Sequence, residues 1–199
     1  MKKIIMITVA VLAGVGLSTV SYTHAATITG SKHDLSASTG GEICIACHTP
    51  HNANTTITDA PLWNHTMTTA TYTLYDSPTF NGHVSISQPT GVSKLCLSCH
   101  DGTVAPDAFT GHAGVTTIAT AGNLGTNLKK SHPISFTYDA ALATADGELK
   151  DPGTLPAGWI NNSKFECSSC HDVHNKTGIA KMLHATNTGS ALCLTCHLK

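Results

Sequence analysis

A five-residue pattern, Cys-x-x-Cys-His, occurs four times in the chain and accounts for every one of its eight cysteines. The copies occupy residues 44–48, 96–100, 167–171 and 193–197. Two thiols at this spacing can bond to the two vinyl groups on one edge of a porphyrin, and the adjacent histidine then supplies an axial nitrogen to iron. Cysteine pairs also serve zinc sites and thiol redox chemistry. Four copies, each followed by histidine, favour four covalently attached haem c groups over both alternatives.

The pattern assigns a role to each of these residues. The residues expected to attach haem are Cys44, Cys47, Cys96, Cys99, Cys167, Cys170, Cys193 and Cys196. The expected proximal metal ligands are His48, His100, His171 and His197. No catalytic residue is assigned.

The residues from 26 onward contain eight further histidines, which are candidates for the distal ligands, but only two methionines. Since at most two haems could therefore take a methionine, we expect bis-histidine ligation. His33, His51, His132 and His174 recur at matching places in two halves of the chain, so they are the expected distal metal ligands. His65 and His184 also match each other and remain alternatives. His83 and His112 lie beside glycine outside the pattern, and a surface role is expected for them.

The order of these residues indicates an internal duplication. Each half has a histidine, then Cys-x-x-Cys-His-x-x-His-Asn, then another histidine, then Leu-Cys-Leu-x-Cys-His, with spacers of different length. We therefore expect a first dihaem unit at 26–125 and a second at 126–199, with the boundary near 111–125.

The His-x-x-His spacing constrains which haem the second histidine can reach. Residues three apart lie on one face of a helix, whereas the axial ligands of one iron approach from opposite sides. His51 and His174 should therefore reach a neighbouring haem, which brings haems close together. We expect His51 to bind a haem of an adjacent subunit; the competing interpretation gives it to the second haem of its own chain.

The first 25 residues have the pattern of a secretory signal peptide. Lys2 and Lys3 precede an apolar run at 4–17, and Thr23-His24-Ala25 offers a small-residue cleavage site. The alternative is an uncleaved anchor, but the run is shorter than the roughly 20 residues that a spanning helix needs. We expect export to the cell surface or exterior, or alternatively to the periplasm, with no membrane span after cleavage.

Composition bears on both fold and partners. Segments 27–39, 104–126 and 146–163 are rich in turn formers. The expected fold is mostly irregular, with short helices at the haem motifs and few short strands: a haem-cored multihaem cytochrome c. After removal of residues 1–25, nine lysines face twelve acidic side chains, a net charge of −3. An acidic protein argues against nucleic acid as a partner.

Four stretches extend the pattern beyond the haem motifs: KHDLS at 32–36, CHTPHN at 47–52, PLWNH at 61–65 and CHDGT at 99–103. They resemble multihaem c-type cytochromes with doubled Cys-x-x-Cys-His motifs from the surface of metal-reducing bacteria, among them the filament-forming tetrahaem cytochromes of the OmcE type. The resemblance implies little regular secondary structure, bis-histidine haems, and a haem stack that continues from subunit to subunit.

These observations predict an electron carrier rather than an enzyme. A multihaem reductase needs an open axial position, which the surplus of histidine disfavours. The expected partners are other cytochromes or electron acceptors, together with further copies of the chain in a filament; a soluble periplasmic shuttle is the alternative. The aromatic residues Trp63, Trp159, Phe136, Tyr138 and Phe165 are expected to pack against porphyrin rather than to relay electrons.

Overall fold

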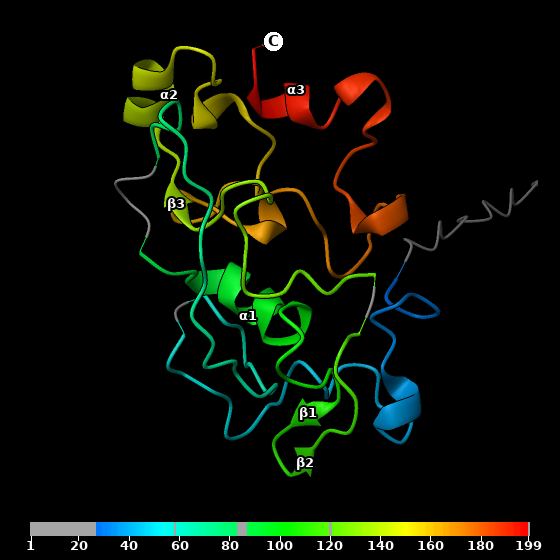
Figure 1. Ribbon diagram of the computed structural model, residues 1–199. Helices are drawn as coiled ribbons and strands as arrows, with labels where there is room; N and C mark the ends of the chain where they lie inside the picture. The colour runs from blue at the N-terminus through cyan, green and yellow to red at the C-terminus, as the bar shows by residue number, and fades with distance from the viewer. Residues whose placement is uncertain (1–26, 58, 83–86, 120, 199) are drawn as a thin grey trace, which may run out of the picture.

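The computed structural model describes residues 27–57, 59–82, 87–119 and 121–198, and most of this chain is irregular (Figure 1). The expected signal segment 1–25 and His83 lie outside the described residues. The longest described helices are α1 (Gly91–His100) and α2 (Ala140–Asp146). The other helices are single turns: η1 (Ser36–Ser38), η3 (Pro152–Thr154), η4 (Cys167–Ser169), η5 (Ala180–Met182), η6 (Thr188–Ser190) and α3 (Cys193–Cys196).

The strands form two small antiparallel sheets. β1 (Ala108–Phe109) pairs with β2 (His112–Ala113), and β3 (Phe136–Thr137) pairs with β4 (Lys164–Phe165). The expected fold class, mostly irregular with short helices and few short strands, is therefore confirmed. None of the helices in the described ranges is long and apolar enough to cross a lipid bilayer.

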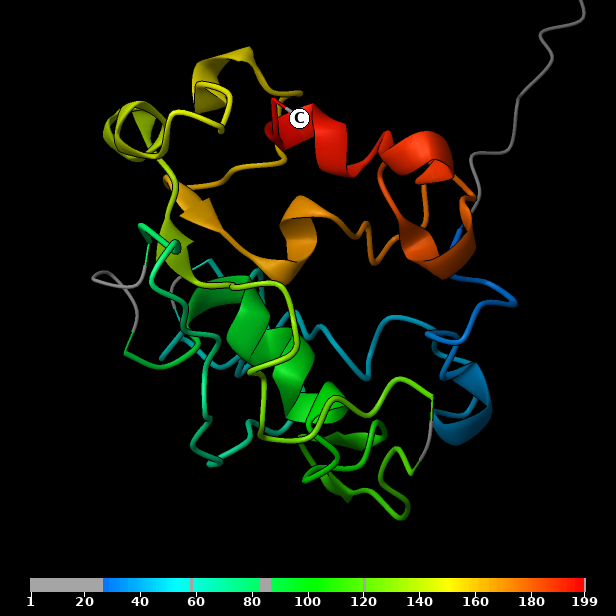
Figure 2. The same cartoon turned by 45° about the horizontal axis from the view of Figure 1, so that its top comes forward.

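Helix α1 lies near the middle of the molecule in both views (Figures 1 and 2). Its Leu97 is fully buried and packs with Tyr72 and Leu128 in one of two small apolar clusters. Asp101 follows the helix, and its carboxylate accepts hydrogen bonds from the hydroxyls of Thr68 and Tyr72, each at 2.6 Å. These bonds fix the irregular segment around 68–72 against the C-terminal end of α1.

The second apolar cluster joins β3, β4 and α2. Phe136 and Phe165 lie opposite each other in the sheet, and their rings stack with centres 5.3 Å apart. Helix α2 begins at a side-chain cap, in which the Leu142 N–H donates to Asp139 Oδ1 at 2.9 Å. Side-chain capping of this kind satisfies an N–H that the helix itself leaves unpaired.

A buried polar contact joins α1 to η4, and the two helices lie side by side in both views (Figures 1 and 2). Glu166 is 5% exposed and accepts hydrogen bonds from the Ser93 N–H at 3.2 Å and the Ser135 hydroxyl at 3.0 Å. The Cys167 N–H donates to Ser93 Oγ at 3.0 Å. At Gly91, with φ +50°, an added Cβ would lie 3.1 Å from the Glu166 carboxylate. The second and third haem motifs are thus fixed against each other.

Candidate haem-binding site

The four Cys-x-x-Cys-His motifs adopt tight, hydrogen-bonded turns, three of them on helices. Residues 96–100 end α1, 167–169 form η4 and 193–196 form α3. The motif at 44–48 is not helical, but the His48 N–H still donates to the Cys44 carbonyl at 2.8 Å. The same bond joins His171 to Cys167 and His197 to Cys193. In each of these motifs the turn brings the histidine back beside the first cysteine, as haem attachment requires.

Three proximal histidines are oriented by hydrogen bonds to backbone carbonyls. Nδ1 lies 2.7 Å from Pro61 O in His48, 2.7 Å from Gly122 O in His100, and 2.9 Å from Lys181 O in His171. Because a carbonyl can only accept, Nδ1 must carry the proton. The Nε2 lone pair is then free, which is the tautomer that a metal ligand needs.

Ring-to-ring spacing identifies pairs of histidines that fit opposite sides of one metal. An imidazole nitrogen binds a metal at about 2.0 Å and lies about 1.1 Å from its ring centre, so two opposed rings have centres about 6.2 Å apart. The ring centres are 6.2 Å apart for His48 and His174, and 6.4 Å apart for His132 and His197.

The third pair, His33 and His100, has ring centres 5.8 Å apart. The residues that form this pair agree with the duplication, because His33 and His132 hold matching places before the first motif of their halves. Each lies beside the proximal histidine of the second motif in its own half. His174, by contrast, lies beside a proximal histidine of the other half.

His51 and His171 are the two expected ligands that the structure does not bring to a partner ring. His51 is exposed, and among the described residues no aromatic or histidine ring packs against it. His171 lies close enough to His33 to affect it electrostatically: burial, with His100 and then His171, holds the pKa of His33 below its ordinary value.

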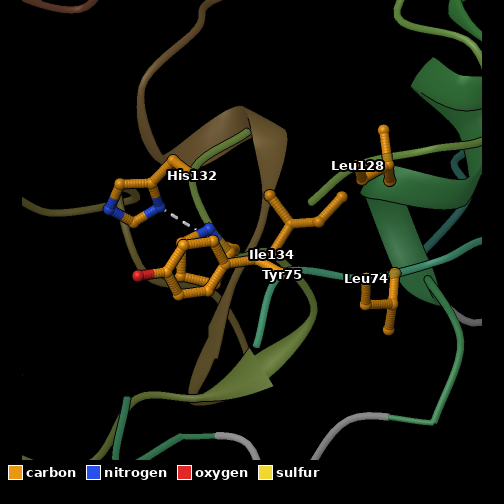
Figure 3. A pocket seen from close by; sticks show the side chains of 6 residues that line it. Leu74, Tyr75, Leu128, His132 and Ile134 are labelled. Carbon is orange, nitrogen blue, oxygen red and sulfur yellow. Dashed lines mark hydrogen bonds between the residues drawn. The ribbon is translucent and has the colours of Figure 1, made fainter. Parts of the chain in front are cut away.

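Figure 3 shows the surroundings of His132, with Tyr75 beside its ring and Leu74, Leu128 and Ile134 toward α1. The enclosed cavity among these side chains holds only about 10 Å³, room for no more than one water. It is therefore part of the packing behind the histidine and not a cofactor cavity.

The backbone around the first and third motifs repeats closely and corrects one expected equivalence. The Asn64 N–H donates to Cys47 O at 2.8 Å, and the His184 N–H donates to Cys170 O at 2.9 Å. The structural equivalent of His184 is therefore Asn64, and the match between His65 and His184 is wrong by one residue. Spacers of different length hid this offset in the sequence.

Hydrogen bonds give the two alternative histidines structural roles. His184 Nε2 lies 2.8 Å from Ser168 O, and Asn64 Nδ2 donates to Ile45 O, the equivalent carbonyl in the first motif. His65 is 2% exposed, and its Nε2 lies 2.9 Å from Ala105 O. In both histidines the Nε2 proton is thus directed at a carbonyl of the chain.

His112, for which a surface or hydrogen-bonded polar role is expected, is half-buried. Its Nδ1 lies 2.7 Å from the carbonyl oxygen of Asp107, and its ring stacks on Phe109 with centres 5.1 Å apart. The ring is therefore packed within the β1–β2 hairpin.

Cysteines of successive motifs lie close together. A hydrogen bond to Cys167, followed by burial, raises the pKa of the Cys96 thiol. Burial and then the nearby Cys47 raise the pKa of Cys99 to about 12. Burial and then Cys196 raise the pKa of Cys170 to about 11. Electrostatic interactions between thiols thus link the first motif to the second, the second to the third and the third to the fourth.

Most of these thiols do not fit thiol redox chemistry, which needs a thiol with a lowered pKa. Burial raises the pKa of Cys47, Cys99, Cys170 and Cys196, whereas a hydrogen bond with Cys96 lowers the pKa of Cys167. Within the described ranges, no group of three or more His, Cys, Asp or Glu side chains could hold a metal ion.

Buried polar atoms without hydrogen-bond partners indicate that a group outside the polypeptide fits beside the proximal histidines. In the described part of the chain, His33 Nδ1, Trp63 Nε1 and Asn64 Oδ1 are buried and have no hydrogen-bond partner. Such atoms are uncommon in folded proteins and call for an explanation. His33 pairs with His100 and Trp63 packs against His48, so two of the three lie beside proximal histidines. Haem with its axial ligands fits this arrangement.

Some of these features have no signal in the sequence. Pro61, Gly122 and Lys181 orient histidines through backbone carbonyls, which every residue type has. Glu166 precedes the third motif without resembling a known haem-site residue, and only the fold reveals its contact with Ser93.

Comparison with known families bears on the C-terminal part of the chain. Residues 161–199 match a family model described as a doubled CXXCH motif. The matched stretch contains the third and fourth motifs and covers less than half of the chain. No curated protein matches the chain. The match supports a multihaem c-type cytochrome with covalently bound haem c, the class of exported proteins that transfers electrons.

Proposed function

We propose that the protein is a tetrahaem c-type cytochrome that carries electrons along a chain of closely spaced bis-histidine haems. The observation that carries the proposal is the set of three histidine pairs, each joining a proximal histidine to an expected distal one, two of them at the spacing of two ligands on one metal and the third slightly closer. Bound haem iron supplies reversible one-electron chemistry. The chain attaches each haem through two cysteines and orients it through its axial histidines.

The cysteine contacts support a continuous order of haems. Cys47 and Cys99 lie close together, Cys96 contacts Cys167, and Cys170 lies close to Cys196. The attachment edges of successive haems would therefore be neighbours from the first motif to the fourth. An electron carrier needs this proximity, since transfer between distant centres is slow.

The ligand set predicts low reduction potentials. All eight assigned axial ligands are histidines, and methionine, which raises the potential of a haem, has no place among them. We expect several overlapping reduction steps.

We further propose that the carrier assembles into extracellular filaments through a histidine shared between subunits. His51 is exposed and unpaired with a ring in the described chain, while His171 is the proximal histidine without a paired ring. His33 lies beside His100, the place that His51 would need in order to bind the second haem of its own chain. In this proposal His51 of one subunit completes the third haem of the next.

Intact mass spectrometry tests the haem count. The secreted protein should exceed its apoprotein mass by four haems, and three or fewer would contradict the proposal. Electron paramagnetic resonance of the oxidised wild type should show only low-spin iron. A high-spin signal with the stoichiometry of one haem would favour a reductase instead.

His51→Ala tests the assembly. The variant should keep four haems and stay folded, but it should be monomeric by electron microscopy and contain one high-spin haem. His112→Ala is the matched control, because that ring packs on Phe109 within its own hairpin. Filaments of His51→Ala with every haem low-spin would contradict shared ligation. Monomeric wild-type protein would favour the periplasmic shuttle.

A further inference from the structure

Trp63 has a buried hydrogen-bond donor for which the described chain offers no acceptor. Its Nε1 atom is shielded from solvent and unpaired. Burying an N–H without a partner destabilises a fold, so this indole should donate to a group outside the polypeptide. We infer that Trp63 donates a hydrogen bond to a propionate carboxylate of the first haem, the one attached at Cys44 and Cys47. This inference rests on the proposed function.

The orientation of Trp63 is compatible with a position beside that haem. Its ring meets the His48 ring edge-on, with centres 6.2 Å apart and planes at 88°. An axial imidazole stands perpendicular to the macrocycle that it ligates, so a ring perpendicular to His48 can lie parallel to the macrocycle. Trp63 is thus disposed to pack on the proximal face of the first haem.

The chemistry of the acceptor follows from the haem periphery. Its edge consists of hydrocarbon substituents and two propionates, and only the carboxylates are strong hydrogen-bond acceptors. Bonds from a neutral donor to an ionised acceptor are also stronger than neutral pairs. The alternative acceptor is an ordered water, which the experiment below separates from a carboxylate.

The internal duplication provides a natural contrast. His48 forms a backbone bridge with Trp63, and His171 forms the equivalent bridge with Leu183. Leucine has no donor, so the third haem lacks this hydrogen bond. The chain therefore distinguishes two haems that the duplication otherwise treats alike.

The hydrogen bond has a direct consequence for proton uptake. A donor stabilises the ionised carboxylate and lowers its pKa. Removing the donor raises the pKa of the propionate, so the pH range over which the first haem's potential varies should move upward.

The test uses holoprotein with Trp63→Phe, which keeps an aromatic ring and removes the N–H. The matched control is Trp159→Phe. Trp159 stacks nearly parallel on His184, and its Nε1 is not among the buried atoms that lack a hydrogen-bond partner. Both variants should keep four haems by intact mass. Trp63→Phe should shift the pH dependence of one reduction potential to higher pH, and Trp159→Phe should leave all four unchanged.

A wild-type measurement keeps the inference testable if Trp63→Phe binds fewer haems. Exchange into D₂O should shift a propionate bending mode in the resonance Raman spectrum of one haem. An unshifted mode, or an unchanged pH dependence in a four-haem Trp63→Phe protein, overturns the inference; the second result is also what an ordered-water acceptor gives. Absence of haem at Cys44 and Cys47 in the wild type would instead overturn the proposed function.

Discussion

His48 and His174 come from opposite halves of the chain, and their rings stand 6.2 Å apart with planes only 20° from parallel. His174 follows the third motif by three residues, yet it lies beside the proximal histidine of the first. Under the proposed ligation, the first haem is attached by one half of the chain and completed by the other. The expected units at 26–125 and 126–199 would then depend on each other, although their boundary itself stays a prediction.

Replacing His174 tests directly whether it completes the first haem from the other half of the chain. His174→Ala should keep four thioether-bound haems, because no cysteine changes, but one haem should lose its sixth ligand and become high-spin. Electron paramagnetic resonance and the visible spectrum of the oxidised protein measure this change. A fully low-spin spectrum would show that His174 is not an axial ligand.

Position 184 should tolerate asparagine, because the structurally equivalent residue in the first half is Asn64. His184→Asn loses the stack on Trp159 but can retain a hydrogen bond to Ser168 O, so every haem should stay low-spin and stability should fall less than in His184→Ala. His184→Ala loses that bond and the stack on Trp159, and should cost about 1–3 kcal/mol of unfolding free energy. Denaturant titration of both variants measures this difference. A high-spin haem in His184→Asn would instead identify His184 as a ligand.

Glu166 should contribute to stability in a pH-dependent way. Burial raises its pKa, outweighing the hydrogen bonds from Ser93 and Ser135 and the charge of Lys164 that lower it. Because the folded state binds this proton more tightly than the unfolded chain, its stabilising effect is present at low pH and is lost as pH rises through the raised pKa.

Glu166→Gln should remove that pH dependence, and Glu166→Ala should cost about 1–3 kcal/mol because the Ser93 N–H loses its acceptor. Unfolding free energies measured across acidic and neutral pH test both expectations. Glu42→Gln is the control, since Glu42 lies near the first motif but is exposed. If the unfolding free energies of wild type and Glu166→Gln varied with pH in the same way, the prediction would be contradicted.

Asp101 should show the opposite pH dependence. Burial alone raises its pKa, but hydrogen bonds from Thr68, Tyr72 and Thr103 outweigh burial and leave the pKa lowered. Its contribution should therefore be present above the unfolded-state pKa and be lost as pH falls through the lowered folded-state value.

Asp101→Asn should destabilise the protein by about 1–3 kcal/mol at neutral pH, with a smaller loss on acidification than wild type. Thermal or denaturant unfolding at neutral and acidic pH measures both effects. Asp76→Asn, at an exposed position, is the control. If Asp101→Asn were as stable as the wild type at neutral pH, a structural role for this carboxylate would be contradicted.

The sequence by itself determined the attachment chemistry, because a thioether site is local: two cysteines and a histidine within five residues contain all of it. It also determined the mostly irregular fold class, since turn formers interrupt every long segment in which apolar periodicity could develop. The duplication is visible too, as an order of motifs, and it puts His33 and His132 at matching positions in the two halves.

Only the tertiary structure decided which residues meet across the chain. The pairing of His48 with His174, the contact of Cys96 with Cys167 and the equivalence of His184 with Asn64 all depend on how irregular spacers fold. Such spacers have no periodicity that would indicate their path. Backbone carbonyls orient three of the proximal histidines, and they leave no trace in the sequence because every residue has one.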